Sequence, residues 1–234
     1  MFTDAWTQKA DIPVNVSAGA AFSNGNFGYF IGGTNSTCNG QTSNVYRYNP
    51  NLNNWTSGLA PLPVSFQAAN NWNSNQTGDH SYILGGNSGC FLNTFYKYNH
   101  SLNTWTSLLN YPGTARGNTV LMVINGRVFA GMGRDWACNV ANFNDFREYL
   151  PQGNNWVSKA NYIGMPGYTL GYFVLGDYGY VIDQNLDINR YDPVMNTWTR
   201  LQCKCPIVPD AVGVVNGKAY VISTRGQGTY EFTP

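Results

Sequence analysis

The chain has 234 residues and a net charge of +1, and only 11% of its residues are charged, against about 25% in ordinary globular proteins. So balanced a charge leaves no basic face for nucleic acid, and no apolar run approaches the roughly 18 residues that cross a bilayer. No signal peptide is expected at Met1. The chain also contains 31 Asn and 26 Gly, which is typical of many tight turns between short strands.

The first unit of the chain is predicted to hold four short strands. Apolar runs that alternate or are β-branched, separated by turn residues, place these strands near 18–23, 28–33, 45–48 and 54–57. The polar run 23–26 predicts a hairpin turn between the first two strands, and Asn49-Pro50 marks the turn between the last two. No segment of the chain shows sustained helical periodicity. The sequence therefore predicts an all-β protein.

A phrase built around tryptophan recurs along the chain. Each copy contains an aromatic residue, a turn with Asn, Asp or Pro, then Trp-Thr or Trp-Val, and a proline further on. The tryptophans are Trp6, Trp55, Trp105, Trp156 and Trp198, at spacings of 49, 50, 51 and 42 residues. We expect these rings to pack between neighbouring units. Four-stranded units of this length in tandem are typical of a β-propeller.

The chain begins and ends in the middle of a unit. Residues 1–10, with Trp6, match the fourth strand of a unit, and residues 228–234 match the third. The N-terminal strand is therefore expected to complete the last blade and to close the ring, which removes exposed sheet edges. The prediction is one propeller domain over 1–234, with five blades of four antiparallel strands. The units cover about 11–58, 59–108, 109–159, 160–201 and 202–234.

The repeated pattern of Gly-Gly after the second strand, Tyr-x-Tyr-x-Pro, Asn-x-Trp and a later proline resembles the kelch repeat. The resemblance covers the whole chain. Gly32-Gly33 and Gly85-Gly86 carry the glycine pair in the first two units, whereas Asp183 and Ser223 stand at this place in the last two. The resemblance implies a kelch-type propeller. Kelch propellers usually have six or seven blades, so a count of five is a departure.

The order of strands assigns the loops to two faces. If the strands a to d of each unit run antiparallel, the b–c loops share one face with the connections that lead from d to the next unit. The b–c loops are long in units one to three, and long loops often carry binding residues. We therefore expect a binding surface there, with Arg134, Asp135 and Trp136 as candidate ligand-binding residues. Neutral drift in loop length is the alternative.

A second candidate surface is the mouth of the central channel on the same face. The residue four positions after each unit's proline opens strand a near the axis. These residues are Ser17, Gln67, Arg116, Leu170 and Asp210. In kelch proteins that bind peptides, residues near this position contact the partner, and the resemblance implies the same role here. A channel plugged by water or by an ion pair between Arg116 and Asp210 is the alternative.

All five cysteines are predicted to lie on this face as well. Cys38, Cys90 and Cys138 fall in successive b–c loops, and Cys203 and Cys205 fall in the connection to the last unit. One or two disulfides between neighbouring loops would suit a secreted protein, and free thiols are the alternative. A metal cluster is disfavoured because no Cys-x2-Cys pair is present. With an odd number, at least one thiol stays free or pairs between chains.

Motifs of catalysis are nearly absent from the sequence. There is no Walker loop, HExxH, GxSxG or dinucleotide fingerprint, and no carboxylate pair suggests a glycosidase. Some kelch-fold enzymes are copper radical oxidases, which need two His ligands and a Tyr cross-linked to Cys. His80 and His100 are predicted on the face opposite the cysteines, which disfavours such a site. No cofactor or metal is expected.

Together these features predict a non-catalytic, kelch-like binding module for a protein or a glycan, located outside the cell or on a cell or virus surface. No nucleic-acid partner and no membrane insertion are expected. The low charge and the abundance of Asn, Tyr and Trp suit stacking against carbohydrate, and they suit peptide contact as well. One alternative is a structural subunit that self-associates in a larger assembly. Another is a kelch-type oxidase or sugar isomerase.

Overall fold

The computed structural model describes residues 7–35, 40–65, 74–136, 141–223, 226 and 228–234. In these ranges the regular structure is β-strand, apart from a short 3-10 helix at Pro151–Gly153. None of the described helical structure is long and apolar enough to cross a membrane. The all-β class that the sequence predicts is confirmed.

Five antiparallel sheets follow one another along the described chain, four with four strands and the last with three. The first contains β2 (Ala20–Ser23), β3 (Gly28–Ile31), β6 (Val45–Asn49) and β7 (Asn54–Thr56). The second contains β8 (Ser74–Thr77), β9 (His80–Leu84), β12 (Phe95–Asn99) and β13 (Thr104–Leu108). The third contains β14 (Val120–Ile124), β15 (Arg127–Gly131), β18 (Phe146–Leu150) and β19 (Asn155–Ser158). The fourth contains β20 (Thr169–Leu175), β21 (Tyr178–Asp183), β22 (Asp187–Asp192) and β23 (Thr197–Lys204), and the fifth contains β24 (Ala211–Val215), β25 (Lys218–Ser223) and β26 (Gly228–Phe232).

Local sequence signals explain where these strands turn. The Asn-Gly pairs that join β14 to β15 and β24 to β25 have positive φ at both positions, 50° and 75° at Asn125-Gly126 and 50° and 73° at Asn216-Gly217. Such turns match the right-handed twist of the flanking strands. The fourth strand of the fourth sheet runs past the expected unit boundary at residue 201, because Lys204 pairs in register with Asp187 and their charged groups lie 3.3 Å apart.

The three long b–c loops are themselves folded into short ribbons. In the first unit β4 (Thr34–Asn35) pairs with β5 (Gly40–Gln41) and with β1 (Val16–Ser17). In the second β10 (Asn87–Ser88) pairs with β11 (Cys90–Phe91). In the third β16 (Arg134–Asp135) pairs with β17 (Ala141–Asn142). Hydrogen bonds between the short strands therefore hold the backbone of these loops, and this fixes where the side chains project from it.

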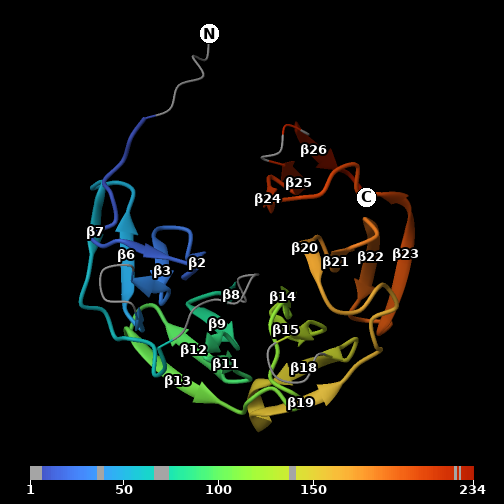
Figure 1. Cartoon of the computed structure of the whole chain (residues 1–234), viewed down its shortest axis with the longest axis horizontal. Coiled ribbons are helices and arrows are strands. Elements are labelled where there is room, and N and C mark those ends of the chain that lie inside the picture. Colours follow the sequence, from blue (N-terminus) through green and yellow to red (C-terminus); the bar gives the residue numbers. More distant parts are fainter. Residues whose placement is uncertain (1–6, 36–39, 66–73, 137–140, 224–225, 227) are drawn as a thin grey trace.

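The sheets stand side by side around an arc, with β2, β8, β14, β20 and β24 on its inner side (Figure 1). Each of these inner strands contacts the next. The arc is open between the fifth sheet and the first. Residues 7–10 form no strand, and no described strand pairs with the outer side of β26. Residues 1–6, which are expected to complete the fifth sheet, lie outside the described residues.

Apolar cores lie between neighbouring sheets, and tryptophan occupies three of them. Trp156 of the third sheet packs on Phe95 of the second, with ring centroids 5.0 Å apart. Trp198 of the fourth sheet packs on Phe146 of the third at 5.1 Å. Phe95 and Phe146 are almost fully buried. Trp105, Trp156 and Trp198 thus pack between units, as predicted, whereas the ring of Trp55 packs on Tyr48 of its own sheet, with centroids 5.2 Å apart.

A repeated set of hydrogen bonds, here the Trp bracket, ties each of the first four sheets to the chain that precedes it. In the third sheet the indole N–H of Trp156 donates to the carbonyl of Leu109 at 2.9 Å, and the N–H of Leu109 donates to Oδ1 of Asn154 at 2.8 Å. The same Oδ1 accepts the hydroxyl of Tyr149 at 2.8 Å. The other brackets are Trp55–Ala10–Asn53–Tyr48, Trp105–Ala60–Asn103–Tyr98 and Trp198–Ala160–Asn196–Tyr191.

Candidate functional site

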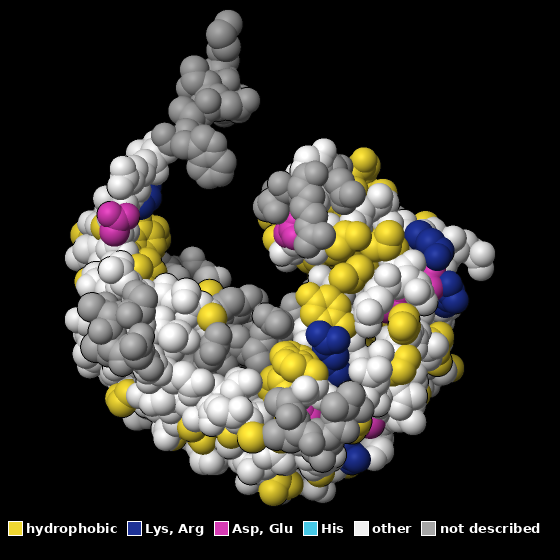
Figure 2. All heavy atoms as spheres, viewed as in Figure 1, with side chains coloured by type: hydrophobic (Ala, Val, Ile, Leu, Met, Phe, Trp, Pro, Cys, Tyr) yellow, Lys and Arg dark blue, Asp and Glu magenta, His cyan; other side chains and the backbone are white. Residues whose placement is uncertain are grey.

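An exposed aromatic cluster lies where the ribbons of the second and third units meet. We name it the Trp136 platform, and it consists of Phe91, Gly117, Arg134, Trp136 and Tyr168. Trp136 is 38% exposed, whereas Phe91 beside it is 5% exposed. Figure 2 shows hydrophobic and basic side chains side by side on the inner side of the arc, near β14 and β20. The platform therefore combines an accessible indole with a buried aromatic support.

Two contacts hold the indole ring of Trp136 in place. The ring of Phe91 meets it edge to face, with centroids 4.3 Å apart and planes at 72°. The guanidinium carbon of Arg134 lies 4.7 Å from the centroid of the Trp136 ring and 5.1 Å from that of Tyr168. A cation at this distance from an exposed aromatic ring contributes about 0.5–1 kcal/mol. The ring is thus oriented without being buried.

The backbone beneath the platform needs glycine at position 117. The N–H of Gly117 donates to the carbonyl of Arg134 at 2.9 Å, and the N–H of Arg134 donates back at 2.9 Å. A Cβ on residue 117 would lie 2.7 Å from Cε1 of Phe91 and 2.8 Å from Cη2 of Trp136. Any larger residue would push both rings aside. The glycine therefore lets the rings lie directly on the main chain.

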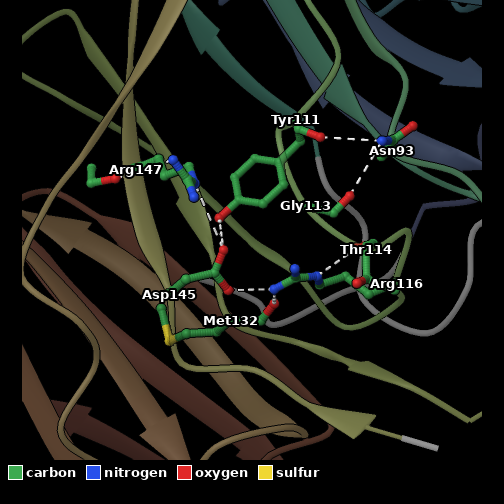
Figure 3. A network of polar contacts seen from close by, with 9 residues as sticks. Asn93, Tyr111, Gly113, Thr114, Arg116, Met132, Asp145 and Arg147 are labelled. Atoms are coloured by element: carbon green, nitrogen blue, oxygen red, sulfur yellow. Dashed lines mark hydrogen bonds and ion pairs between the residues drawn. The ribbon is translucent and has the colours of Figure 1, made fainter. Parts of the chain in front are cut away.

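Arg116, the neighbour of Gly117, belongs to a buried polar network (Figure 3). Its side chain is only 4% exposed and forms an ion pair with Asp145. Its Nε donates to the carbonyl of Thr114 at 2.8 Å, and its guanidinium carbon lies 3.6 Å from the centroid of the Phe143 ring. The hydroxyl of Tyr111 donates to the other carboxylate oxygen of Asp145 at 2.8 Å.

The polar network around Arg116 has a structural role. Burial, and next the charge of Asp145, raise the pKa of Tyr111 far above its usual range, so its hydroxyl stays a hydrogen-bond donor. Arg116 uses its donors on Asp145 and on main-chain carbonyls. The network therefore ties the connection between the second and third sheets to the start of β18. This place differs from the open channel mouth expected for Arg116, and its ion-pair partner is Asp145 rather than Asp210.

Three of the remaining channel-mouth residues, Ser17, Leu170 and Asp210, lie at or near the starts of strands in the described structure. Ser17 is exposed and pairs with Thr34, and Leu170 is half-buried in β20. Asp210 is exposed, and its carboxylate accepts the hydroxyl of Ser223 at 3.4 Å. Gln67 lies outside the described residues. Of the residues that the sequence singles out, the structure brings together Arg134 and Trp136, while Asp135 next to them is buried.

The cysteines are only partly described. Cys38 and Cys138 lie outside the described residues, and Cys90 is exposed in β11. Cys203 is exposed at the end of β23 and Cys205 is buried, and both are free thiols. Burial raises the pKa of the Cys205 thiol, which donates to the carbonyl of Ile207 at 3.1 Å. A disulfide among the b–c loops stays a prediction.

The two histidines serve the packing of the second sheet. Nε2 of His100 lies 3.0 Å from Oγ of the buried Ser81, and the ring packs edge to face on Phe22 and Tyr98 and at a tilt on Tyr29. Nε2 of His80 lies 3.3 Å from Nδ2 of Asn99. Across the ranges that the structure describes, no three His, Cys, Asp or Glu side chains are grouped so that they could hold a metal ion.

Three members of the platform were missed by sequence reasoning. Phe91 and Gly117 stand next to residues that the sequence singled out, Cys90 and Arg116, but their meeting depends on how two loops fold onto each other. Tyr168 lies in the connection to the fourth sheet, two residues before Leu170, which the sequence singled out and which lies in β20. The one sequence signal for the platform was that the long loop of the second unit, like that of the third, contains an aromatic residue, Phe91.

No family model matches the chain, and no curated protein matches its sequence.

Proposed function

We propose that this chain is a non-catalytic binding module that contacts a glycan or a protein through the Trp136 platform. The observation that carries the proposal is the state of Trp136, which is held by Phe91 and Arg134 and is nevertheless 38% exposed. Aromatic side chains that are both rigid and exposed lose little conformational entropy when a ligand covers them. Such rings are favoured at the centres of binding surfaces.

A glycan is the partner that the platform fits best. A flat indole can stack against the C–H face of a sugar ring, and the N–H groups of Arg134 can donate to its hydroxyl or carboxylate oxygens. The charge content of only 11% also favours a ligand bound by stacking and hydrogen bonds over one bound by charge. A protein loop that presents an aromatic or acidic side chain is the second kind of partner.

For the whole chain we propose a five-bladed, kelch-like propeller, with an N-terminal strand that supplies the fourth strand of the fifth sheet. Support comes from the five successive sheets, from the Trp brackets and from Ala10, which already forms the bracket of the first sheet. We place this module outside the cell or on a cell or virus surface. There its neutral, Asn-rich loops would meet glycans.

The proposal is tested by screening on a glycan array that carries neutral and acidic oligosaccharides. We expect the intact protein to bind a defined subset and Trp136→Ala to lose at least about tenfold in affinity, which is about 1.4 kcal/mol. Leu102→Ala is the matched control, because Leu102 is 70% exposed and lies in the turn between β12 and β13. Equal binding by Trp136→Ala and the intact protein would remove the platform from the account.

A further inference from the structure

An apolar slot lies between the fourth and fifth sheets, where the other junctions hold tryptophan. The slot is a cavity of about 270 Å³ whose lining includes Ile188, Cys205 and Phe232. Ile188 and Cys205 are 4% and 3% exposed, and Phe232 packs edge to face on Phe173. The slot is therefore formed by the core of the junction.

The two preceding junctions show what such a slot contains. At the second, Trp156 lies among Phe95, Tyr111 and Tyr149, with ring centroids 5.0, 5.2 and 5.3 Å away. At the third, Trp198 lies among Phe146, Tyr162 and Tyr191, at 5.1, 5.0 and 4.9 Å. In each case the tryptophan comes from the outermost strand of the later sheet. The surrounding residues come from both sheets and from the connection between them.

Ile188, Cys205 and Phe232 correspond in position to Phe146, Tyr162 and Tyr191 of the third junction. Hydrogen bonds and strand register show this. The N–H of Cys205 donates to the carbonyl of Leu186, two residues before Ile188, just as the N–H of Tyr162 donates to Asn144, two before Phe146. Phe232 is opposite the second residue of β25, as Tyr191 is opposite the second residue of β21. The fourth junction thus has the surroundings of a tryptophan but no tryptophan of its own among the described residues.

The segment that fits the slot is the N-terminal one. Ala10 follows Trp6 by four residues, as Leu109 follows Trp105 and Ala160 follows Trp156. Ala10 also forms the bracket of the first sheet, as Leu109 and Ala160 do for the third and fourth. From this spacing we expect the residues before Ala10 to form the outermost strand of a sheet that precedes the first. No described strand pairs with the outer side of β26, and this edge offers the hydrogen bonds that such a strand needs.

Which copy supplies this strand follows from the shape of the arc. The four described junctions are packed while the first and fifth sheets remain apart on either side of the opening (Figures 1 and 2). Insertion from the same chain would require the arc to narrow, whereas insertion from another chain leaves the packed junctions as they are. We infer that the slot and the edge of β26 receive Trp6 and its strand from a second copy. This inference rests on the proposed completion of the fifth sheet.

The interface is heterologous, since donor strand and acceptor slot are different surfaces, and this makes it testable by complementation. Trp6→Ala removes the donor side chain, and Cys205→Trp fills the acceptor slot from within. By light scattering after size-exclusion chromatography, we expect the intact protein to form dimers or longer assemblies and each variant alone to be monomeric. An equimolar mixture of the two variants should give a species of twice the mass of one chain, because one complete donor then meets one complete acceptor.

A peptide competition covers the case in which Cys205→Trp does not fold. A synthetic peptide of residues 1–10 should dissociate the assemblies of the intact protein, and the same peptide with alanine at position 6 should not. A monomeric intact protein, or assemblies that neither peptide affects, would overturn the inference. Trp136→Ala, the variant of the proposed glycan surface, should assemble as the intact protein does. Failure of glycan binding and failure of strand exchange are thus separate results.

Discussion

The asparagine of each Trp bracket combines two properties in one residue. Asn53, Asn103, Asn154 and Asn196 all have positive φ, between 44° and 53°. Apart from glycine, asparagine is one of the residues that tolerate this left-handed conformation best. Its side-chain oxygen also accepts a main-chain N–H from the preceding connection and a tyrosine hydroxyl from its own sheet. The sequence shows the repeated Asn-x-Trp, but the shared acceptor depends on chain segments about 45 residues apart.

Replacing this asparagine separates conformation from hydrogen bonding. We expect Asn154→Ala to lower the free energy of unfolding by about 2 kcal/mol, because the strain of positive φ is added to the loss of two hydrogen bonds. Asn154→Gly should cost about 1 kcal/mol, because glycine adopts the same φ without strain. Urea unfolding of both variants measures the difference. Equal losses would show that the conformation of residue 154 contributes nothing.

His100 makes stability depend on pH. Burial lowers the pKa of His100 below its usual 6.5, and the Asp79 carboxylate opposes this only in part. The unfolded chain therefore binds the proton near pH 6.5, while the folded chain binds it only at lower pH. The contribution of neutral His100 is fully present above about pH 6.5. It is lost as the pH falls from there toward the folded pKa.

Unfolding in urea at pH 7.5 and at pH 5.5 measures this contribution. The intact protein should lose more stability between these values than His100→Gln, in which position 100 no longer titrates. His80→Gln is the matched control, since His80 is the other histidine of the second sheet and packs against no aromatic cluster of this kind among the described residues. An unchanged pH dependence in His100→Gln would contradict the assignment.

Among the connecting elements, the one between the second and third sheets is fixed by charge. Arg116 is buried and pairs with Asp145, whose side chain is 29% exposed, and the hydroxyl of Tyr111 donates to the same carboxylate. Removing one partner of a fully buried pair costs about 3–5 kcal/mol, and the solvent that reaches Asp145 should bring the cost here to the lower end of that range. Arg116→Ala should therefore unfold at distinctly lower urea concentration than the intact protein. The double variant Arg116→Ala, Asp145→Asn should be more stable than Arg116→Ala alone, and a double variant that is less stable would contradict this role.

Strands and turns are the elements that the sequence predicts well. The four strands of the first sheet begin and end within two residues of their predicted bounds, because alternation and Asn-Gly turns are local signals. The short ribbons β4–β5, β10–β11 and β16–β17 were not predicted. Each has only two residues per strand, too few for a periodic pattern. The long loops that contain them were recognised by length alone.

On the scale of the whole molecule, the repeat fixes the sequence of sheets but not how the arc ends. Trp105, Trp156 and Trp198 fill the cores between neighbours, as predicted from their spacing. The Trp136 platform was only half predicted, because Trp136 and Arg134 share a loop whereas Phe91 and Tyr168 come from other units. Contacts between loops depend on the angle between sheets, which no local pattern encodes. The proposed strand exchange also belongs to this scale, because it concerns how the first and last sheets are joined.

The Trp brackets build the frame of the molecule, while Trp136 remains available to a partner. Hydrogen exchange of the indole N–H groups, followed by NMR and assigned with single Trp→Phe variants, tests both halves at once. The bracket indoles of Trp55, Trp105, Trp156 and Trp198 should exchange at least about a hundredfold more slowly than that of Trp136, an opening free energy of about 2.7 kcal/mol. Bracket indoles that exchange as fast as Trp136 would contradict the account.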